Sequence, residues 1–212
     1  GEGTYTVNSN GTVTFNPLPT FYGTASSRPY QISDALGETA SATITASVGT
    51  PPLPRAQPNT SSDDYDTDQT LSPLDGDTAG SSSFPLQVSS IKLCGLADNT
   101  VTPAIAAETP NSCSQTTVTV PGEGTYTLNT TTGVVTFDPL PTFTGQVQTP
   151  VTYQVKDSLD RYVNSTLTPT VGPPPVPTAT ADALTRGYDA NQLYTPLGND
   201  TAGAADFPLL AT

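Results

Sequence analysis

The sequence predicts an all-β protein built from tandem Ig-like β-sandwich repeats that are joined by Pro-rich linkers. Three observations lead to this fold class. Thr, Ser and Val are abundant, apolar residues alternate with polar ones over short segments, and long segments recur at a spacing of about 122 residues. The branched side chains of Thr and Val suit a pleated, half-buried strand, and matches that recur in order at near-constant spacing indicate a repeat architecture.

The internal repeat covers most of the chain. The longest matches are GEGTYT at 1–6 and 122–127, PLPTF at 17–21 and 139–143, DTAG at 77–80 and 200–203, and FPL at 84–86 and 207–209. They occur in the same order and at spacings of 121 to 123 residues. A biased composition alone does not produce such matches.

Each copy contains a predicted β-hairpin. In the first copy, Tyr5 and Val7 alternate with Thr, residues 8–11 supply the Asn and Gly that a tight turn needs, and Val13 and Phe15 alternate again. The second copy repeats the pattern at Tyr126, Leu128, Val135 and Phe137, with one extra residue in between. Because the inward-facing set is retained, we place that insertion in the turn, where it leaves the register unchanged.

Two further strands are expected in each copy. The matching pairs are Tyr30 with Tyr153, Ile32 with Val155, Ile44 with Leu167 and Val48 with Val171. Pro169 lies inside the last of these strands. Since Pro cannot donate a ladder hydrogen bond, it predicts that this strand lies at a sheet edge.

Pro-rich segments set the expected domain boundaries. Residues 49–53 and 172–176 each follow a terminal strand, and such Pro runs favour the extended polyproline II conformation of a semi-rigid spacer. We therefore expect the C-terminal part of one repeat at 1–48, a complete repeat at 54–171 and the N-terminal part of a third at 177–212. The two partial repeats together lack only the equivalents of about 90–121.

The only two cysteines, Cys94 and Cys113, are interpreted as one disulfide. The chain has no His and no further Cys to complete a zinc site. Closing a loop of this length stabilises the fold by about 3 kcal/mol in the chain-entropy model. The alternative is a pair of free buried thiols. A disulfide implies an oxidising, extracellular location.

The composition excludes several functions. Nineteen acidic residues against 6 basic ones give a net charge of −13, so no basic patch is available for nucleic acid. No apolar run approaches the roughly 20 residues of a membrane span, so no membrane insertion is expected in this segment. Without His, the usual Ser-His-Asp and Cys-His catalytic groups are absent. We therefore expect no enzyme activity and no catalytic residues.

Gly-Glu-Gly at 1–3 and 122–124 does not form a phosphate-binding loop, because the downstream Gly-Lys-Ser/Thr is missing. It predicts a tight turn into a strand.

An acidic run at 63–68 is the one set of residues that indicates a metal, and no other cofactor is expected. Calcium binds six to eight oxygen ligands, largely from carboxylates and carbonyls. The candidate ligands are Asp64, Asp66, Asp68 and Asp77. The alternative is a solvated acidic loop beside a linker, which the next copy favours because it keeps only Asp189 and Asp200.

Five sequons for N-glycosylation occur, at Asn10, Asn59, Asn129, Asn164 and Asn199. Chance matches are the alternative, because the chain is rich in Asn, Ser and Thr.

Several of these segments resemble the CshA-type fibril repeat of bacterial surface proteins. The resemblance rests on VTVPGEGTY at 118–126, VTF-x-P at 135–139, P-x-F-x-G at 141–145, VTYQV-x-D at 151–157 and NDT at 199–201. It covers nearly the whole chain. It implies tandem β-sandwich domains that form surface fibrils, with adhesion assigned to separate, non-repeat regions.

These observations predict a structural repeat of an extracellular fibril or stalk, located on a bacterial surface or in a secreted filament. The expected partner is a further copy of the chain in a head-to-tail fibre, formed by continuation or by completion of the partial domains. The alternative is an adhesive module that binds host protein or glycan through loops or sheet edges.

Overall fold

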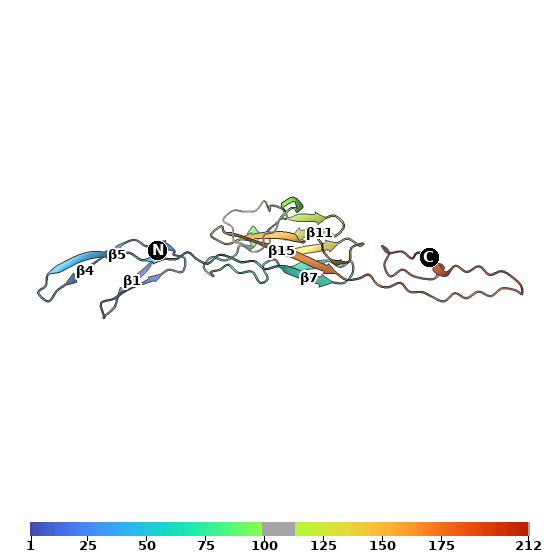
Figure 1. The fold of residues 1–212 in the computed structure, drawn as a ribbon, viewed down its shortest axis with the longest axis horizontal. Coiled ribbons are helices and arrows are strands. Elements are labelled where there is room, and N and C mark those ends of the chain that lie inside the picture. The colour runs from blue at the N-terminus through green and yellow to red at the C-terminus, as the bar shows by residue number, and fades with distance from the viewer. Residues whose placement is uncertain (99–112, 212) are drawn as a thin grey trace.

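The computed structural model describes residues 1–98 and 113–211, and these residues form an elongated, all-β protein (Figure 1). Hairpins from the N-terminal segment lie at one end of the long axis, packed sheets occupy the middle, and an extended C-terminal segment lies at the other end. The described residues form 15 strands and three short 3-10 helices. The predicted all-β class is confirmed.

The N-terminal segment forms three two-stranded antiparallel pairs, β1 with β2, β3 with β6 and β4 with β5. The strands are β1 (Gly3–Val7), β2 (Val13–Pro17), β3 (Gly23–Thr24), β4 (Arg28–Ser33), β5 (Thr39–Ile44) and β6 (Ser47–Val48).

The central segment contains the remaining strands, which form two sheets. They are β7 (Asn59–Asp63), β8 (Gln69–Leu71), β9 (Lys92–Leu93), β10 (Thr117–Val120), β11 (Gly124–Leu128), β12 (Val135–Pro139), β13 (Gly145–Gln146), β14 (Val151–Lys156) and β15 (Tyr162–Val171). One sheet has the order β10-β11-β12-β8. The other has the order β13-β15-β14-β9, with β7 paired in parallel to β15. The short helices are η1 (Val88–Ser90), η2 (Leu96–Asp98) and η3 (Pro196–Gly198).

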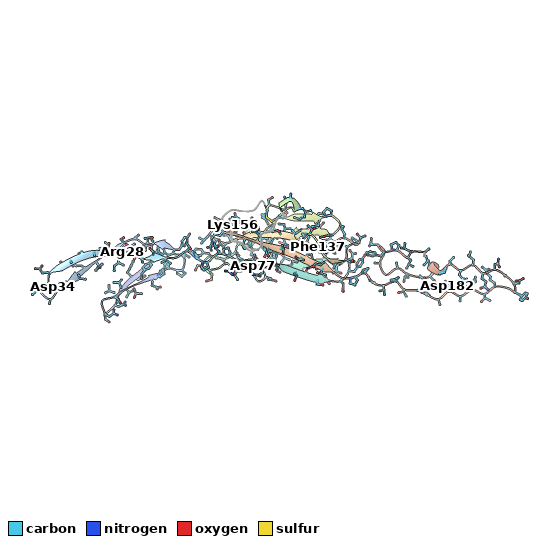
Figure 2. The ribbon with its side chains drawn as sticks, viewed as in Figure 1. Arg28, Asp34, Asp77, Phe137, Lys156 and Asp182 are labelled. Atoms are coloured by element: carbon cyan, nitrogen blue, oxygen red, sulfur yellow. A yellow bond between two sulfur atoms is a disulfide. The ribbon has the colours of Figure 1, made fainter. Side chains whose placement is uncertain are left out.

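One hydrophobic core lies between these two sheets. Tyr126 and Phe137 of the first sheet are fully buried, as are Tyr153, Val155 and Leu167 of the second, and all five belong to a single cluster. Figure 2 shows Phe137 within the packed sheets. The alternation of apolar residues in the sequence therefore identified the inward-facing positions of the central segment correctly.

The N-terminal hairpins repeat the pairing of the central sheets. Arg28 pairs with Ile44 as Val151 pairs with Leu167, and the rest of each ladder follows in the same register. Tyr5 and Phe15 stack with ring centroids 4.6 Å apart, the same separation as Tyr126 and Phe137. The burial differs, because Ile32 is 61% exposed whereas its counterpart Val155 is fully buried.

The prediction that Pro169 marks a sheet edge is wrong. Pro169 lies within β15, which pairs with β7 on one side and with β13 and β14 on the other. Its carbonyl accepts a hydrogen bond from the Val147 N–H, just beyond the end of β13. The N and C=O of one strand residue point to the same side. The missing donor therefore faces the break between β13 and β14, where no ladder partner is required.

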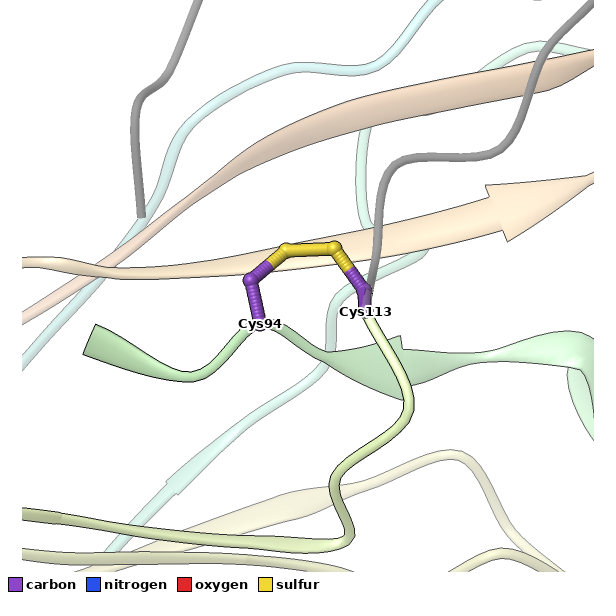
Figure 3. Close-up of a disulfide and its surroundings, with 2 residues drawn as sticks. All are labelled: Cys94 and Cys113. Atoms are coloured by element: carbon purple, nitrogen blue, oxygen red, sulfur yellow. A yellow bond between two sulfur atoms is a disulfide. The ribbon is translucent and has the colours of Figure 1, made fainter. Parts of the chain in front are cut away.

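Cys94 and Cys113 form a disulfide in the structure (Figure 3). Both residues are buried, and the Cys94 N–H donates to the carbonyl of Thr152 in β14. The bond thus fixes both ends of the intervening segment beside the second sheet.

Removing both thiols in the double variant Cys94→Ala/Cys113→Ala is expected to lower the free energy of unfolding by about 3 kcal/mol, because the unfolded chain regains the freedom of the open loop. Urea denaturation followed by circular dichroism measures the change. The reduced wild type should match the variant, whereas reductant should not affect the variant. Equal stability of the oxidised wild type and the variant would contradict the expectation.

Candidate functional site

The candidate functional surfaces are the two places where a Pro-rich segment meets the central sheets. At the first place, Arg161 lies in the turn between β14 and β15. Its Nη1 donates to the Pro51 carbonyl at 2.9 Å, and its Nε donates to Asp157 Oδ2 at 2.8 Å. Arg161 therefore joins the proline-rich segment to the body of the central sheets.

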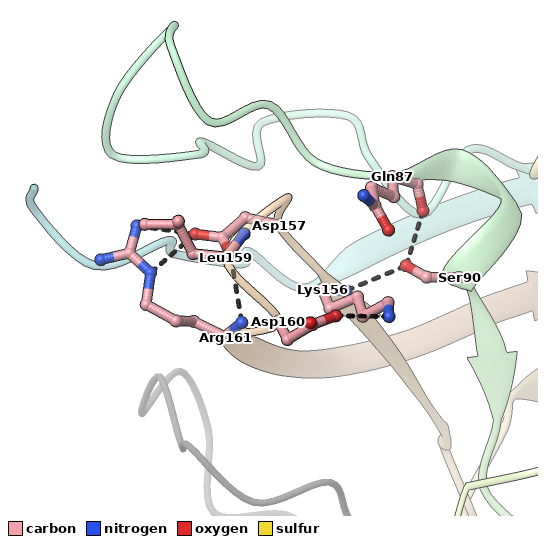
Figure 4. Close-up of polar contacts among 7 residues, drawn as sticks. All are labelled: Gln87, Ser90, Lys156, Asp157, Leu159, Asp160 and Arg161. Atoms are coloured by element: carbon pink, nitrogen blue, oxygen red, sulfur yellow. Dashed lines mark hydrogen bonds and ion pairs between the residues drawn. The ribbon is translucent and has the colours of Figure 1, made fainter. Parts of the chain in front are cut away.

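Asp157 is suited to hold that arginine because it is fully buried. Its Oδ1 accepts the backbone N–H groups of Leu159 and Arg161, and its Oδ2 lies 2.6 Å from Arg161 Nη2 (Figure 4). A buried carboxylate needs both an opposite charge and hydrogen-bond donors to offset its desolvation. The turn supplies both, so the guanidinium orientation is fixed.

Aromatic and glycine contacts complete the first junction. The rings of Tyr22 and Phe84 meet edge to face with centroids 6.0 Å apart, a favourable arrangement for an aromatic pair. Gly80 has a positive φ of 76°, and a side chain there would clash with the carbonyl of Pro52. The Gly of the recurring DTAG sequence is thus required for close packing against the linker.

The second junction is built similarly but uses a different tyrosine. The Tyr65 hydroxyl, in the turn between β7 and β8, donates to the Pro141 carbonyl at 2.5 Å. Its ring lies 6.0 Å from that of Phe207, the counterpart of Phe84. A side chain at Gly203 would clash with the Pro175 carbonyl, as one at Gly80 would with Pro52. In both places the Pro-rich segment is therefore approached closely by the segment that follows it.

The repeated Glu of the GEGTYT sequence has a role that the sequence did not reveal. The Glu123 carboxylate is buried and accepts the backbone N–H groups of Gln148 and Thr149, at 2.9 and 3.2 Å. In the first copy, Glu2 accepts the N–H and hydroxyl of Ser26. These hydrogen bonds from Ser26 lower the pKa of Glu2. This Glu holds the loop that precedes β4 in the first copy and β14 in the second. The sequence signal for this role was that Glu occurs at the same position of both copies.

Asp77 lies in a polar cluster rather than in the acidic run. Its Oδ1 accepts the Gln57 N–H at 2.7 Å, and its Oδ2 accepts the Tyr153 hydroxyl at 2.9 Å. Burial raises the pKa of Asp77 to about 6, although these two hydrogen bonds act in the opposite direction. Burial and the nearby Asp77 charge also raise the pKa of Tyr153. Asn59 donates toward the same hydroxyl at 3.4 Å.

The four candidate calcium ligands are not brought together. Asp64, Asp66 and Asp68 lie in the exposed turn between β7 and β8, whereas Asp77 faces Gln57 and Tyr153. Within residues 1–98 and 113–211, no three acidic, His or Cys side chains are grouped as metal ligands. Calcium binding stays a prediction of the sequence.

The five sequons lie in different environments. Asn10, Asn129 and Asn199 are exposed, but Asn59 and Asn164 are buried. The Asn59 amide donates to the carbonyls of Gln57 and Pro73. In the folded protein, only the three exposed side chains are accessible to a glycosyltransferase.

The same hairpins occur in the N-terminal and central segments, which defines a repetitive all-β protein. The family model for the surface adhesin CshA repetitive domain matches residues 1–48 and 51–171. The chain therefore belongs to this family, as its resemblance indicated. Surface adhesins are located at the cell surface, and repeats of this kind are typically not enzymes. No curated protein matches the chain. No helix in the described part is long and apolar enough to cross a membrane.

The raised pKa of Asp77 predicts that its contribution to stability falls as pH rises. The Asp77 carboxyl holds its proton more tightly in the folded protein than in the unfolded chain, where its pKa has the ordinary value of 3.8. The contribution is thus complete below that value and is lost through about pH 6. Because Asp77 is partly solvated, we expect a change of only about 1 kcal/mol.

Urea unfolding of the whole chain between about pH 4 and pH 7 measures this effect, as the difference between wild type and Asp77→Asn. Asp66→Asn, which changes an exposed carboxylate, is the matched control and should keep the wild-type profile. An Asp77→Asn profile parallel to that of wild type would refute the assignment.

Proposed function

We propose that the chain is a structural part of an extracellular fibril or stalk on a bacterial surface, in which Ig-like β-sandwich repeats follow one another head to tail. The repeats are 1–48, 54–171 and 177–212, joined by linkers at 49–53 and 172–176. The observation that carries the proposal is that both linkers are packed against protein, by an equivalent β-bridge and an equivalent close approach of a glycine. A linker that only tethered two domains would not need them.

Some contacts at the first junction have counterparts at the second, although the tyrosines are not equivalent. Arg55 bridges to Thr78 after the first linker, and Thr178 bridges to Thr201 after the second. Phe84 and Phe207 each meet a tyrosine from the segment before the linker. These contacts favour a fixed angle between neighbours, and Pro-rich linkers are themselves stiff.

The remaining features suit a stalk outside the cell. The disulfide limits unfolding in a chain whose apolar content is only 34%. The net charge of −13 opposes lateral association of neighbouring stalks.

A stiff junction predicts a single, narrow distance distribution between the first and second repeats. Fluorophores attached at the exposed positions Asn10 and Thr131 report it by single-molecule energy transfer. The combined variant Pro51→Gly/Pro52→Gly/Arg161→Lys should broaden the distribution. It removes the stiff linker, and lysine lacks the second nitrogen that bonds the Pro51 carbonyl.

Arg161→Lys alone is the matched control for folding, since it keeps a positive charge beside Asp157. A broad wild-type distribution, unchanged by the variants, would rule out a stiff stalk.

Immobilised wild-type chain should also show no specific binding to host extracellular proteins or glycans. Micromolar affinity for one of them would instead support the adhesive function.

A further inference from the structure

The central segment is bounded by two strands that pair with each other. β7 is the first strand after the Pro-rich segment at 49–53, and β15 is the last strand before the one at 172–176. The two strands are parallel over five consecutive residue pairs, which begin with Asn59 beside Leu167. Within the described residues, β7 pairs with no other strand. This ladder therefore connects the strand at which the chain enters the central segment with the strand at which it leaves.

Tension along the long axis acts on this ladder in one particular direction. It pulls β7 from its first residue and β15 from its last residue, because the Pro-rich segments join the strands at those ends. Since the strands are parallel, those two residues lie at opposite ends of the ladder, and the strands are pulled past each other (Figure 1). All hydrogen bonds of the ladder then share the force. If both strands were pulled from the same end, the bonds would break one at a time.

The contacts of the first junction lie ahead of the ladder on this path. Arg161 donates one hydrogen bond to the Pro51 carbonyl, and Arg55 exchanges two backbone hydrogen bonds with Thr78. The ladder spans five residue pairs, so it is the stronger connection. We therefore expect the junction contacts to yield first and the ladder to determine when the central segment unfolds.

The ladder keeps its hydrogen bonds although β15 contains a proline. The Gly172 N–H donates to the Asp63 carbonyl at 2.8 Å, so the polar groups of Asp63 face β15. Because consecutive residues of a strand face alternate sides, those of Ser61 also face β15, whereas those of Ser62 face away. The Pro169 carbonyl accepts a hydrogen bond on the opposite side of β15. The missing N–H of this proline therefore removes no hydrogen bond between β15 and β7.

A buried glutamine of the other sheet cross-links the two strands. Gln69 belongs to β8, which pairs with β12, and its side chain is 2% exposed. Its Oε1 accepts the Ser61 hydroxyl of β7 at 2.6 Å, and its Nε2 donates to the Thr170 carbonyl of β15 at 2.9 Å. One side chain thus bonds to both strands of the ladder. Its burial shields these hydrogen bonds from water, which strengthens them.

We propose that the β7–β15 ladder, cross-linked by Gln69, bears tension along the stalk and keeps the central segment folded when the stalk is pulled. This inference rests on the proposed function, because a stalk comes under tension when both of its ends are attached. The lifetime of a domain under force depends on its rate of unfolding. A ladder that must break before the rest of the fold therefore sets this lifetime, whatever the stability of the remaining core.

Magnetic tweezers test the direction of loading on the whole chain. Handles attached through azide-bearing residues at Thr50 and Val176 pull the two strands past each other. Handles at Asp64, directly after β7, and at Val176 pull both strands from the same end. All three positions are exposed. At one constant force, the first pair of handles should give a dwell time before unfolding that is at least about tenfold longer, because several hydrogen bonds must break together.

Gln69→Met tests the cross-link, because it removes both hydrogen bonds and keeps a side chain of similar volume. With handles at Thr50 and Val176, it is expected to shorten the dwell time by about tenfold. Val118→Ala is the matched control, since it removes buried apolar groups from β10, an edge strand of the other sheet. It should lower the equilibrium stability and leave the dwell time under tension nearly unchanged.

Two proline variants test the ladder itself. Ser61→Pro removes an N–H that faces β15 and the hydroxyl that bonds to Gln69, so it should shorten the dwell time. Ser62→Pro removes an N–H that faces away from β15 and should keep the wild-type dwell time. Circular dichroism checks that each variant is folded. Should Ser61→Pro not fold, Gln69→Met still decides the outcome.

The disulfide identifies the segment that unfolds. Cys94 and Cys113 are 19 residues apart in the sequence, but the disulfide holds their Cα atoms 4.0 Å apart. The double variant Cys94→Ala/Cys113→Ala should therefore lengthen the unfolding step by about 60 Å of contour length.

Equal dwell times for the two pairs of handles, or a Gln69→Met dwell time equal to that of wild type, would overturn the proposal. Both pairs of handles exclude the N-terminal segment, so the stiffness of the first junction does not affect the result. A lifetime that is independent of direction, together with a narrow distance distribution across the junction, therefore rejects this proposal alone. A broad distance distribution rejects the proposed function.

Discussion

The parallel pairing of β7 with β15 is the constraint on which the elongated shape depends. β7 is the first strand after the Pro-rich segment at 49–53, and β15 ends immediately before the one at 172–176. Because these strands point in the same direction, the chain enters the central segment at one end and leaves it at the other. An antiparallel pair would have placed both linkers at one end. The same pair also joins the first and last strands, so the two halves of the segment cannot separate without breaking it.

The local part of this fold could be predicted from the sequence. Alternating residues such as Tyr126 and Leu128, with Asn and Gly between the strands, determine a hairpin through neighbours only a few positions apart. The pairing partners of strands that lie far apart in the sequence could not be predicted. Asn59 pairs with Leu167, and no short-range pattern encodes a contact across that separation. Pro169 was misread for this reason, since its side of the strand depends on where β13 ends.

The candidate site was less accessible to sequence reasoning. Asp77 was grouped with the acidic run because it lies close in sequence, but its partners are Gln57 and Tyr153. Arg161 gave no signal, because its counterpart in the first copy is Glu38 and a single copy cannot show recurrence. The recurrence of Asp77 as Asp200 and of Tyr153 as Tyr30 did carry information. In the central segment the two residues contact each other, since the Tyr153 hydroxyl donates to Asp77.

A polar cluster inside a thin core has a physical use. Burying Asp77 opposes stability, as its raised pKa indicates, but the hydroxyl of Tyr153 can satisfy it in only one alignment of the segments. Apolar contacts among Val, Leu and Thr are less selective, because strands of such composition can slip by two residues and still bury similar surface. The carboxylate and hydroxyl thus favour one register at some cost in stability, the best-attested use of buried polar groups.

The β4–β5 and β14–β15 hairpins show which features depend on local sequence and which depend on strands packed over the hairpin. β4 and β5 form the full ladder although their face is open, so register does not require the cover. Residues 182–194 form no strand, although the Thr180 N–H donates to Asp200 as the Gln57 N–H donates to Asp77. A hairpin closes only a short loop, whereas the pairing of β7 with β15 closes a loop of about a hundred residues and costs more entropy.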